Sequence, residues 1–114
     1  AHALGVRYFD CARSYGDAER FMSSWIAKRG WTPTDICTGS KWGYRYTAGF
    51  RVDTGGEPHE VKDHSLPHLR SQSEETQALL GGHLHLYQIH SATLESGVLR
   101  DQGVLDELRR LKQE

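Results

Sequence analysis

The chain has 114 residues, a net charge of −1 and a pI near 6.7. This balance excludes the clustered basic surface that binding to nucleic acid or to a membrane requires, so neither partner is expected. The longest apolar runs span only a few residues, too few for a transmembrane helix or a signal-peptide core. The two cysteines, Cys11 and Cys37, have no paired spacing, which is typical of a reducing compartment and predicts a cytoplasmic location.

Both ends of the chain predict that it is part of a longer protein. It begins at Ala1 without an initiator methionine, and it ends in a helical pattern over 105–114 that no C-cap glycine closes. The mean hydropathy is −0.65, and large aliphatic residues are scarce for a self-sufficient core. We therefore expect one partial domain over residues 1–114 that relies on surface outside this sequence.

Three short β-favouring runs, at 6–9, 35–41 and 83–90, predict strands, and the first is expected to be buried. They alternate with helical patterns, and such alternation predicts parallel strands joined by right-handed crossovers. The sequence shows no internal repeat. The predicted fold class is therefore α/β.

Helical spacing predicts three helices. The first is expected to begin after Asp17 as N-cap and to stop at Gly30. Its single apolar stripe comprises Ala18, Phe21, Met22, Trp25 and Ile26. The second is expected over 65–80, with Ser65 as N-cap and Pro67 in the first turn. The last carries Val104, Leu105, Leu108 and Leu111.

The segment 42–58 has no period and is rich in glycine, threonine and aromatic residues. It predicts a long loop, and long ordered loops are usually functional. Tyr44, Tyr46 and Phe50 lie on it and are expected either to cover a substrate or to anchor the loop, with anchoring favoured.

Each predicted strand ends in a polar side chain that can take part in chemistry. The first strand ends at Asp10, the second at Lys41 and the third at His90. Because parallel strands share one carboxyl rim, where α/β folds bind ligands, these residues are expected to lie together. Tyr15 follows Asp10 by five residues and is expected above the same rim.

The motifs around these four residues resemble those of the aldo-keto reductases. The stretch 5–19 is similar to the family signature in which Asp and Tyr stand five residues apart before Gly and Glu. The stretches 40–43 and 86–90 resemble the segments that hold the family's lysine and histidine. Cys11 departs from the family, which usually has a small hydroxyl residue there, and could change hydrogen bonding beside Asp10. Ser23 stands where the family often has glycine.

The resemblance implies part of a (β/α)8 TIM barrel, roughly its second to fourth βα units, with about three parallel strands and flanking helices. It implies an oxidoreductase that reduces an aldehyde or ketone to an alcohol, or the reverse, with NADPH (NADP+) as cofactor. The implied partner is a small-molecule carbonyl or alcohol substrate. Most of the cofactor contacts would lie on later strands, so the isolated chain is expected to be inactive.

The resemblance also implies a role for each site residue. Tyr15 would act as general acid, and a free tyrosine hydroxyl is a weak acid near neutral pH. Lys41, held charged by Asp10, would favour the tyrosinate and so strengthen this acid. His90 would bind and orient the substrate carbonyl, and Asp10 would also contact the cofactor. Trp42 is expected either to line the substrate pocket or to pack inside the barrel.

Other interpretations remain open. The chain could be a non-catalytic truncated fragment or binding module, or a metal-dependent hydrolase on a similar barrel. His64 and His68, four apart, and His83 and His85, on one strand face, could each offer two metal ligands. No third ligand completes either set, so these histidines are interpreted as facing solvent. Singly, an Asp, Tyr, Lys or His at a strand end is more often a cap, a packing residue or a solvated charge.

Overall fold

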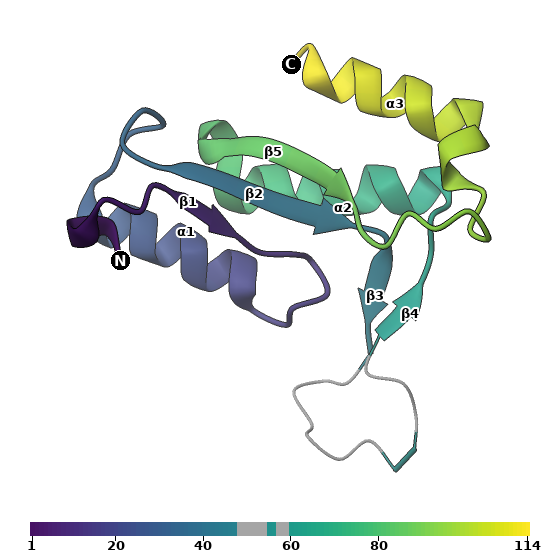
Figure 1. The fold of residues 1–114 in the computed structure, drawn as a ribbon, viewed down its shortest axis with the longest axis horizontal. Coiled ribbons are helices and arrows are strands. Elements are labelled where there is room, and N and C mark those ends of the chain that lie inside the picture. Colours follow the sequence, from purple (N-terminus) through teal and green to yellow (C-terminus); the bar gives the residue numbers. More distant parts are fainter. Residues whose placement is uncertain (48–54, 57–59) are drawn as a thin grey trace.

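The computed structural model describes residues 1–47, 55–56 and 60–114. A parallel sheet forms its centre, in the order β1-β2-β5 (Figure 1). Its strands are β1 (Tyr8–Asp10), β2 (Cys37–Trp42) and β5 (Leu84–Ile89). The register pairs Asp10 with Gly39 and Lys41 with Gln88. The predicted α/β class and the three parallel strands are confirmed.

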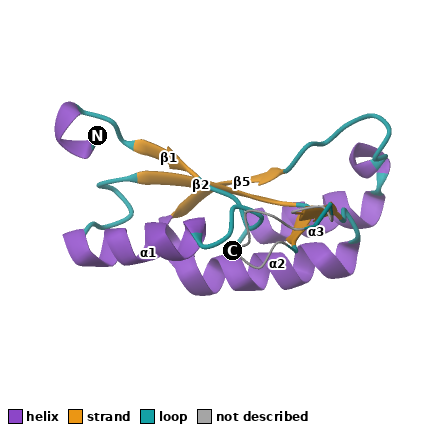
Figure 2. Cartoon of the chain, turned by 90° about the horizontal axis from the view of Figure 1, so that it is seen from below, coloured by secondary structure: helices purple, strands orange, loops and turns teal. Residues whose placement is uncertain are grey.

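The α-helices lie on one side of this sheet (Figure 2). They are α1 (Ala18–Arg29), α2 (Leu66–Leu80) and α3 (Gln102–Lys112), with short 3-10 turns at His2–Leu4, Gly81–His83 and Val98–Arg100. Ser65 caps α2 by accepting a hydrogen bond from the His68 N–H, and Pro67 stands in its first turn, as predicted. Asp17 occupies the N-cap position of α1, but its carboxylate pairs with Arg20 and accepts no capping bond.

A short antiparallel hairpin corrects part of the long loop predicted over 42–58, because residues 44–46 form one of its strands. Its strands are β3 (Tyr44–Tyr46) and β4 (Glu60–Lys62), and it projects beyond the carboxyl end of β2 (Figure 1). Strands of three residues are too short to show a period in the sequence, because alternation needs several residues to be recognised. Phe50, one of the loop aromatics, lies outside the described residues.

The apolar core lies between the sheet and the helices, in two clusters. One contains Cys11, Ile26, Ile36 and Leu80. The other contains Trp42, Leu69, Val98 and Val104. From the strands, Phe9 and Leu84 pack against the first cluster and Trp42 belongs to the second, so the opposite face of the sheet is left for other contacts.

Two burial expectations are wrong. The first strand is not buried, because Val6 and Tyr8 are each 44% exposed and only Phe9 packs against the helices. The helices cover one face, and alternation turns Tyr8 and Asp10 to the other. Phe21 is the one member of the predicted apolar stripe of α1 that is exposed, at 68%, whereas its other members, Ala18, Met22, Trp25 and Ile26, pack in or against the core.

Candidate active site

All four sequence-predicted site residues meet at the carboxyl rim of the sheet. Asp10 is the last residue of β1, Lys41 lies near the end of β2, and His90 directly follows β5. Tyr15 stands in the turn between β1 and α1. Parallel direction and matched register bring these strand ends together, as the sequence predicted.

The Lys41 ammonium is the centre of the group. It is hydrogen-bonded to the Asp10 carboxylate, donates to the carbonyl oxygen of Cys11 at 3.1 Å and lies 3.5 Å from the Tyr15 hydroxyl. Partial burial alone would lower the pKa of Lys41, but the hydrogen bond and charge of Asp10, with a smaller effect of Tyr15, raise it above that of an ordinary lysine. Lys41 is therefore positively charged at neutral pH.

The His90 ring lies between two tyrosines. Its centroid is 5.5 Å from that of Tyr15 and 4.8 Å from that of Tyr44, both edge-on. The Ser14 hydroxyl lies 3.5 Å from His90 Nδ1. Partial burial and the charge of Lys41 lower the pKa of His90, against an opposing effect of Glu60. The ring is therefore neutral at neutral pH and can donate one hydrogen bond to a ligand oxygen.

The turn that carries Tyr15 is fastened to β2 by its backbone. The N–H of Cys11 donates to Gly39 O at 2.9 Å, and the N–H of Arg13 donates to Lys41 O at 3.1 Å. The Cys11 thiol lies in the core, 1% exposed, and donates to Gly39 O at 3.5 Å, so it faces away from Asp10. Burial raises the pKa of this thiol, which stays protonated.

A buried carboxylate below the rim was not predicted as a functional residue. Glu19, 1% exposed, accepts hydrogen bonds from Arg13 at 3.1 Å, Ser40 at 2.6 Å and Thr76 at 2.9 Å. Arg13 also pairs with the exposed Glu75. This network joins α1, β2 and α2 to the turn before Tyr15. Its signal in the sequence is Ser40, a polar residue at a position whose alternation with Lys41 turns it toward the core.

Two further residues touch Asp10 and were also missed. The Tyr8 hydroxyl donates to Asp10 Oδ1 at 3.2 Å, and the Gln88 amide donates to the same oxygen at 3.3 Å. Both face the same side of the sheet as Lys41, by alternation within β1 and by register with β5. Period-two alternation could have placed Tyr8 beside Asp10.

Trp42 is the one site residue that the structure places elsewhere. It is 0% exposed and packs with Leu69, Val98 and Val104 between the sheet and the helices. Because Lys41 points to the open face, the next residue along β2 must point to the helices. The packing alternative therefore describes Trp42, and the expectation that it lines a substrate pocket is not met.

At least one histidine of each predicted pair hydrogen-bonds a backbone carbonyl through Nε2. His64 Nε2 bonds the carbonyl oxygen of His90 at 2.8 Å, and His83 Nε2 bonds that of Trp31 at 2.8 Å. His64, His68 and His83 are half-buried, which corrects the solvent-facing interpretation for these three, and His85 is exposed as expected. Within residues 1–47, 55–56 and 60–114, no group of three or more His, Cys, Asp or Glu side chains is placed to hold a metal ion.

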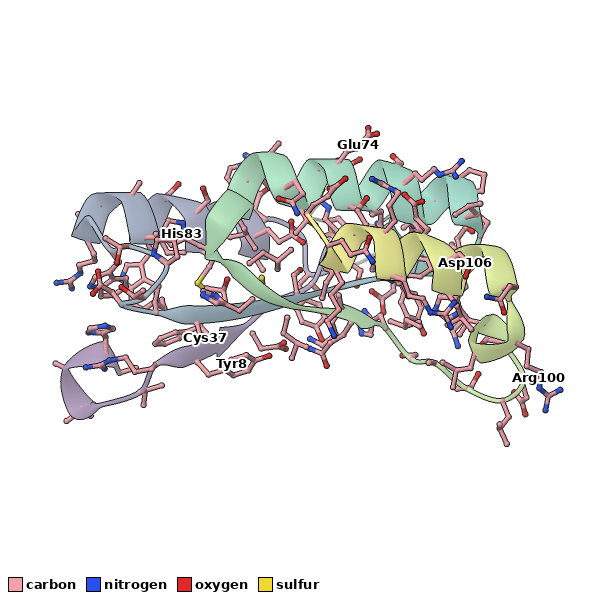
Figure 3. All side chains as sticks on the ribbon, turned by 90° about the horizontal axis from the view of Figure 1, so that it is seen from above. Tyr8, Cys37, Glu74, His83, Arg100 and Asp106 are labelled. Carbon is pink, nitrogen blue, oxygen red and sulfur yellow. The ribbon has the colours of Figure 1, made fainter. Side chains whose placement is uncertain are left out.

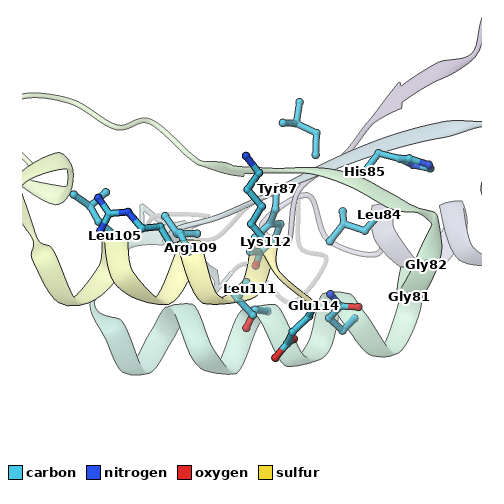
Figure 4. A pocket seen from close by; sticks show the side chains of 14 residues that line it. Gly81, Gly82, Leu84, His85, Tyr87, Leu105, Arg109, Leu111, Lys112 and Glu114 are labelled. Atoms are coloured by element: carbon cyan, nitrogen blue, oxygen red, sulfur yellow. The ribbon is translucent and has the colours of Figure 1, made fainter.

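A groove of about 880 Å³ lies away from the rim, between β5 and α3 (Figure 4). Its walls are mainly apolar and include Leu84, Leu86, Tyr87, Leu105, Leu108 and Leu111. None of the four rim residues lines it, so this groove is not the candidate active site.

No helix in the described part of the chain combines the length and apolar character that crossing a bilayer requires.

Comparisons with known proteins agree with this architecture. No family model and no curated protein matches the chain. Among solved structures, a Pseudomonas aeruginosa protein described as an aldo-keto reductase superposes with a TM-score of 0.74 at 22% identity, over 99% of this chain and 40% of its own. An aldo-keto reductase of Bacillus halodurans, in its holo form, superposes with a TM-score of 0.66 at 21% identity, over 95% of this chain and 34% of its own.

The chain thus spans less than half the length of these structures. At such low identity the comparison concerns the fold, and it agrees with the three parallel strands and one-sided helices seen here. The chain has the fold of part of an aldo-keto reductase barrel.

Proposed function

We propose that the chain is the proton-delivery part of an NADPH-dependent aldo-keto reductase that interconverts an aldehyde or ketone and an alcohol. One observation carries the proposal: the Lys41 ammonium joins the Asp10 carboxylate to the Tyr15 hydroxyl, and the His90 ring stands against Tyr15. A forming alkoxide needs a proton donor, a nearby positive charge and a hydrogen-bond donor. These three groups supply them.

Each residue has one task in this reaction. Tyr15, 49% exposed at the rim, gives its hydroxyl proton to the carbonyl oxygen as the C–H bond forms. Lys41 stabilises the tyrosinate that remains, and Asp10 keeps Lys41 charged and oriented. Neutral His90 donates a hydrogen bond to the same carbonyl oxygen and positions it. In the reverse direction Tyr15 takes the proton from the alcohol.

The residues present fit only the reactive end of the cofactor. The hydride is supplied by NADPH when that cofactor is bound. Asp10, whose side chain is 37% exposed, is the residue of this chain proposed to contact it. The chain spans only 34–40% of the similar structures, and we propose that the remaining cofactor contacts lie on strands outside it.

A second candidate rests on that same partial coverage. In this candidate the protein is a non-catalytic truncated fragment or binding module, in which no hydride source is positioned because the rest of a cofactor site is missing. The two candidates differ in whether the activity appears when the barrel is complete.

The test compares tyrosine variants in the protein that carries this chain within a complete barrel. NADPH oxidation with a panel of aldehydes is followed by absorbance. Tyr15→Phe should reduce turnover by about 10²- to 10⁴-fold, because it deletes only the proton donor. Tyr87→Phe is the matched control, since its hydroxyl is buried on the helix side of β5. A wild type without NADPH turnover, or a loss below about tenfold in Tyr15→Phe, would contradict the proposal.

A further inference from the structure

We propose that Tyr8 is a positioning residue that holds the Asp10 carboxylate against Lys41. Its effect on turnover rests on the proposed function, whereas its effect on the Lys41–Asp10 pair does not.

The carboxylate of Asp10 is held from both sides. Oδ2 accepts from Lys41, and Oδ1 accepts from the Tyr8 hydroxyl at 3.2 Å and from the Gln88 amide at 3.3 Å. A carboxylate that accepts bonds only through one oxygen can rotate about its Cα–Cβ and Cβ–Cγ bonds. Donors on the second oxygen restrict this rotation, so the side chain keeps the orientation that Lys41 needs.

The position of Tyr8 follows from the strand. Tyr8 and Asp10 are two residues apart on β1, so their side chains leave the same face of the sheet. Figure 3 shows the Tyr8 side chain on the side of the sheet opposite α1 and α2. The phenol therefore lies alongside the Asp10 carboxylate, outside the apolar core.

Gly39 provides the space for the Tyr8 ring. A Cβ at Gly39 would lie 2.3 Å from the Tyr8 hydroxyl oxygen and 3.1 and 3.3 Å from two ring carbons. Gly39 is paired with Asp10 in the register, so the ring crosses β2 directly beside the carboxylate. The backbone of Gly39 does not have the positive φ that favours glycine, so its missing side chain matters here through the room it leaves for the phenol.

The Tyr8 hydroxyl is suited to act as a lasting donor. Burial and the neighbouring Asp10 charge raise the pKa of Tyr8 above that of an ordinary tyrosine. The phenol consequently keeps its proton over the whole neutral range and can only donate to Asp10. Gln88 donates to the same oxygen but through a flexible side chain, whereas the rigid Tyr8 ring lies against Gly39.

Two variants separate the hydroxyl from the ring. Tyr8→Phe deletes the donor and keeps the ring, while Gly39→Ala keeps the donor and displaces it from Asp10. Both variants should release the Asp10 carboxylate from Tyr8. The double variant Tyr8→Phe/Gly39→Ala should have about the same effect as either single variant, because both substitutions remove the same hydrogen bond. Tyr87→Phe is the control, since it removes a hydroxyl from the opposite face of the sheet.

The first readout is the protonation of Lys41, followed by NMR with lysine labelled at Cε in the protein carrying the complete barrel. The Lys41 resonance is assigned by its loss in Lys41→Arg. Asp10 is the main cause of the raised pKa of Lys41, so a released carboxylate should lower the titration midpoint in Tyr8→Phe and Gly39→Ala but not in Tyr87→Phe. A merely structural role for Tyr8 would leave this midpoint unchanged.

The second readout is turnover of an aldehyde with NADPH. In Tyr8→Phe we expect kcat to fall by about tenfold with KM little changed, the effect of losing one charge-assisted hydrogen bond behind the reacting groups. An unchanged Lys41 midpoint in both variants would overturn the positioning role, whatever the turnover. A lowered midpoint in a protein without any NADPH turnover would support the positioning role and refute the proposed function.

Discussion

The Lys41 ammonium lies 3.5 Å from the Tyr15 hydroxyl, although 26 positions separate the two residues in the chain. It also lies 4.9 Å from the centroid of the Tyr15 ring, so the charge stands beside both the oxygen and the aromatic face. A cation in this place stabilises the tyrosinate more than the neutral phenol. The role proposed for Tyr15 as proton donor depends on this relationship.

The charge of Lys41 can be tested apart from its hydrogen bonds. We expect Lys41→Met, in the complete barrel, to lower kcat by about 10²-fold or more, because the tyrosinate formed during reduction loses its stabilising cation. Lys41→Arg keeps the charge and should recover part of this loss. The measurement is steady-state turnover across pH, and equal activity of the Met and Arg variants would show that charge is not what Lys41 contributes.

The lowered pKa of His90 predicts that the stability of the fold depends on pH. The pKa of His90 is lowered mainly by partial burial, so the unfolded chain binds a proton more readily than the folded one. The contribution of His90 to stability is therefore complete above the ordinary pKa of histidine, about 6.5, and is lost as pH falls through the lowered value. We expect thermal unfolding to show a smaller loss of Tm between about pH 7 and pH 5 in His90→Gln than in the wild type. An equal or larger loss of Tm in His90→Gln would show that His90 is not the source of the pH dependence.

The buried Glu19 should be important for folding stability. Glu19→Ala leaves Arg13, Ser40 and Thr76 without their common acceptor in a buried site. We expect the free energy of unfolding in urea to fall by about 3–5 kcal/mol, as for other broken buried pairs. Glu75→Ala is the control, because Glu75 pairs with the same Arg13 but is 50% exposed. Glu75→Ala should lower the free energy of unfolding by less than about 1 kcal/mol. Similar losses in both variants would show that the burial of Glu19 does not set its contribution to stability.

The isolated 114-residue chain should associate in solution and show no NADPH turnover. The outer edges of β1 and β5 have no strand partner among the described residues, and such edges invite pairing. Val6 and Leu86, 44% and 46% exposed, leave apolar surface open to solvent. Light scattering at micromolar concentration together with a turnover assay is the measurement. A monomer that reduces an aldehyde with NADPH would refute the expectation.

The placement of the rim residues could be predicted from the sequence because it depends on local order. Strand ends at Asp10, Lys41 and His90 share one rim whenever the strands are parallel, and alternation with helices predicts parallel strands. The cap at Ser65 was also local, since one hydroxyl bonds an N–H three residues later. Such features need only the spacing of residues along the chain.

The tertiary structure alone decided which side chains those rim residues contact. Tyr8 and Gln88 reach Asp10 from different strands, and only the register of β1, β2 and β5 brings their donors to one oxygen. The burial of Glu19 likewise depends on helices packing over β2. Spacing along the chain determines which face and which end of the sheet a residue occupies. Contacts between strands and helices depend on how the elements pack, and that is a property of the whole fold.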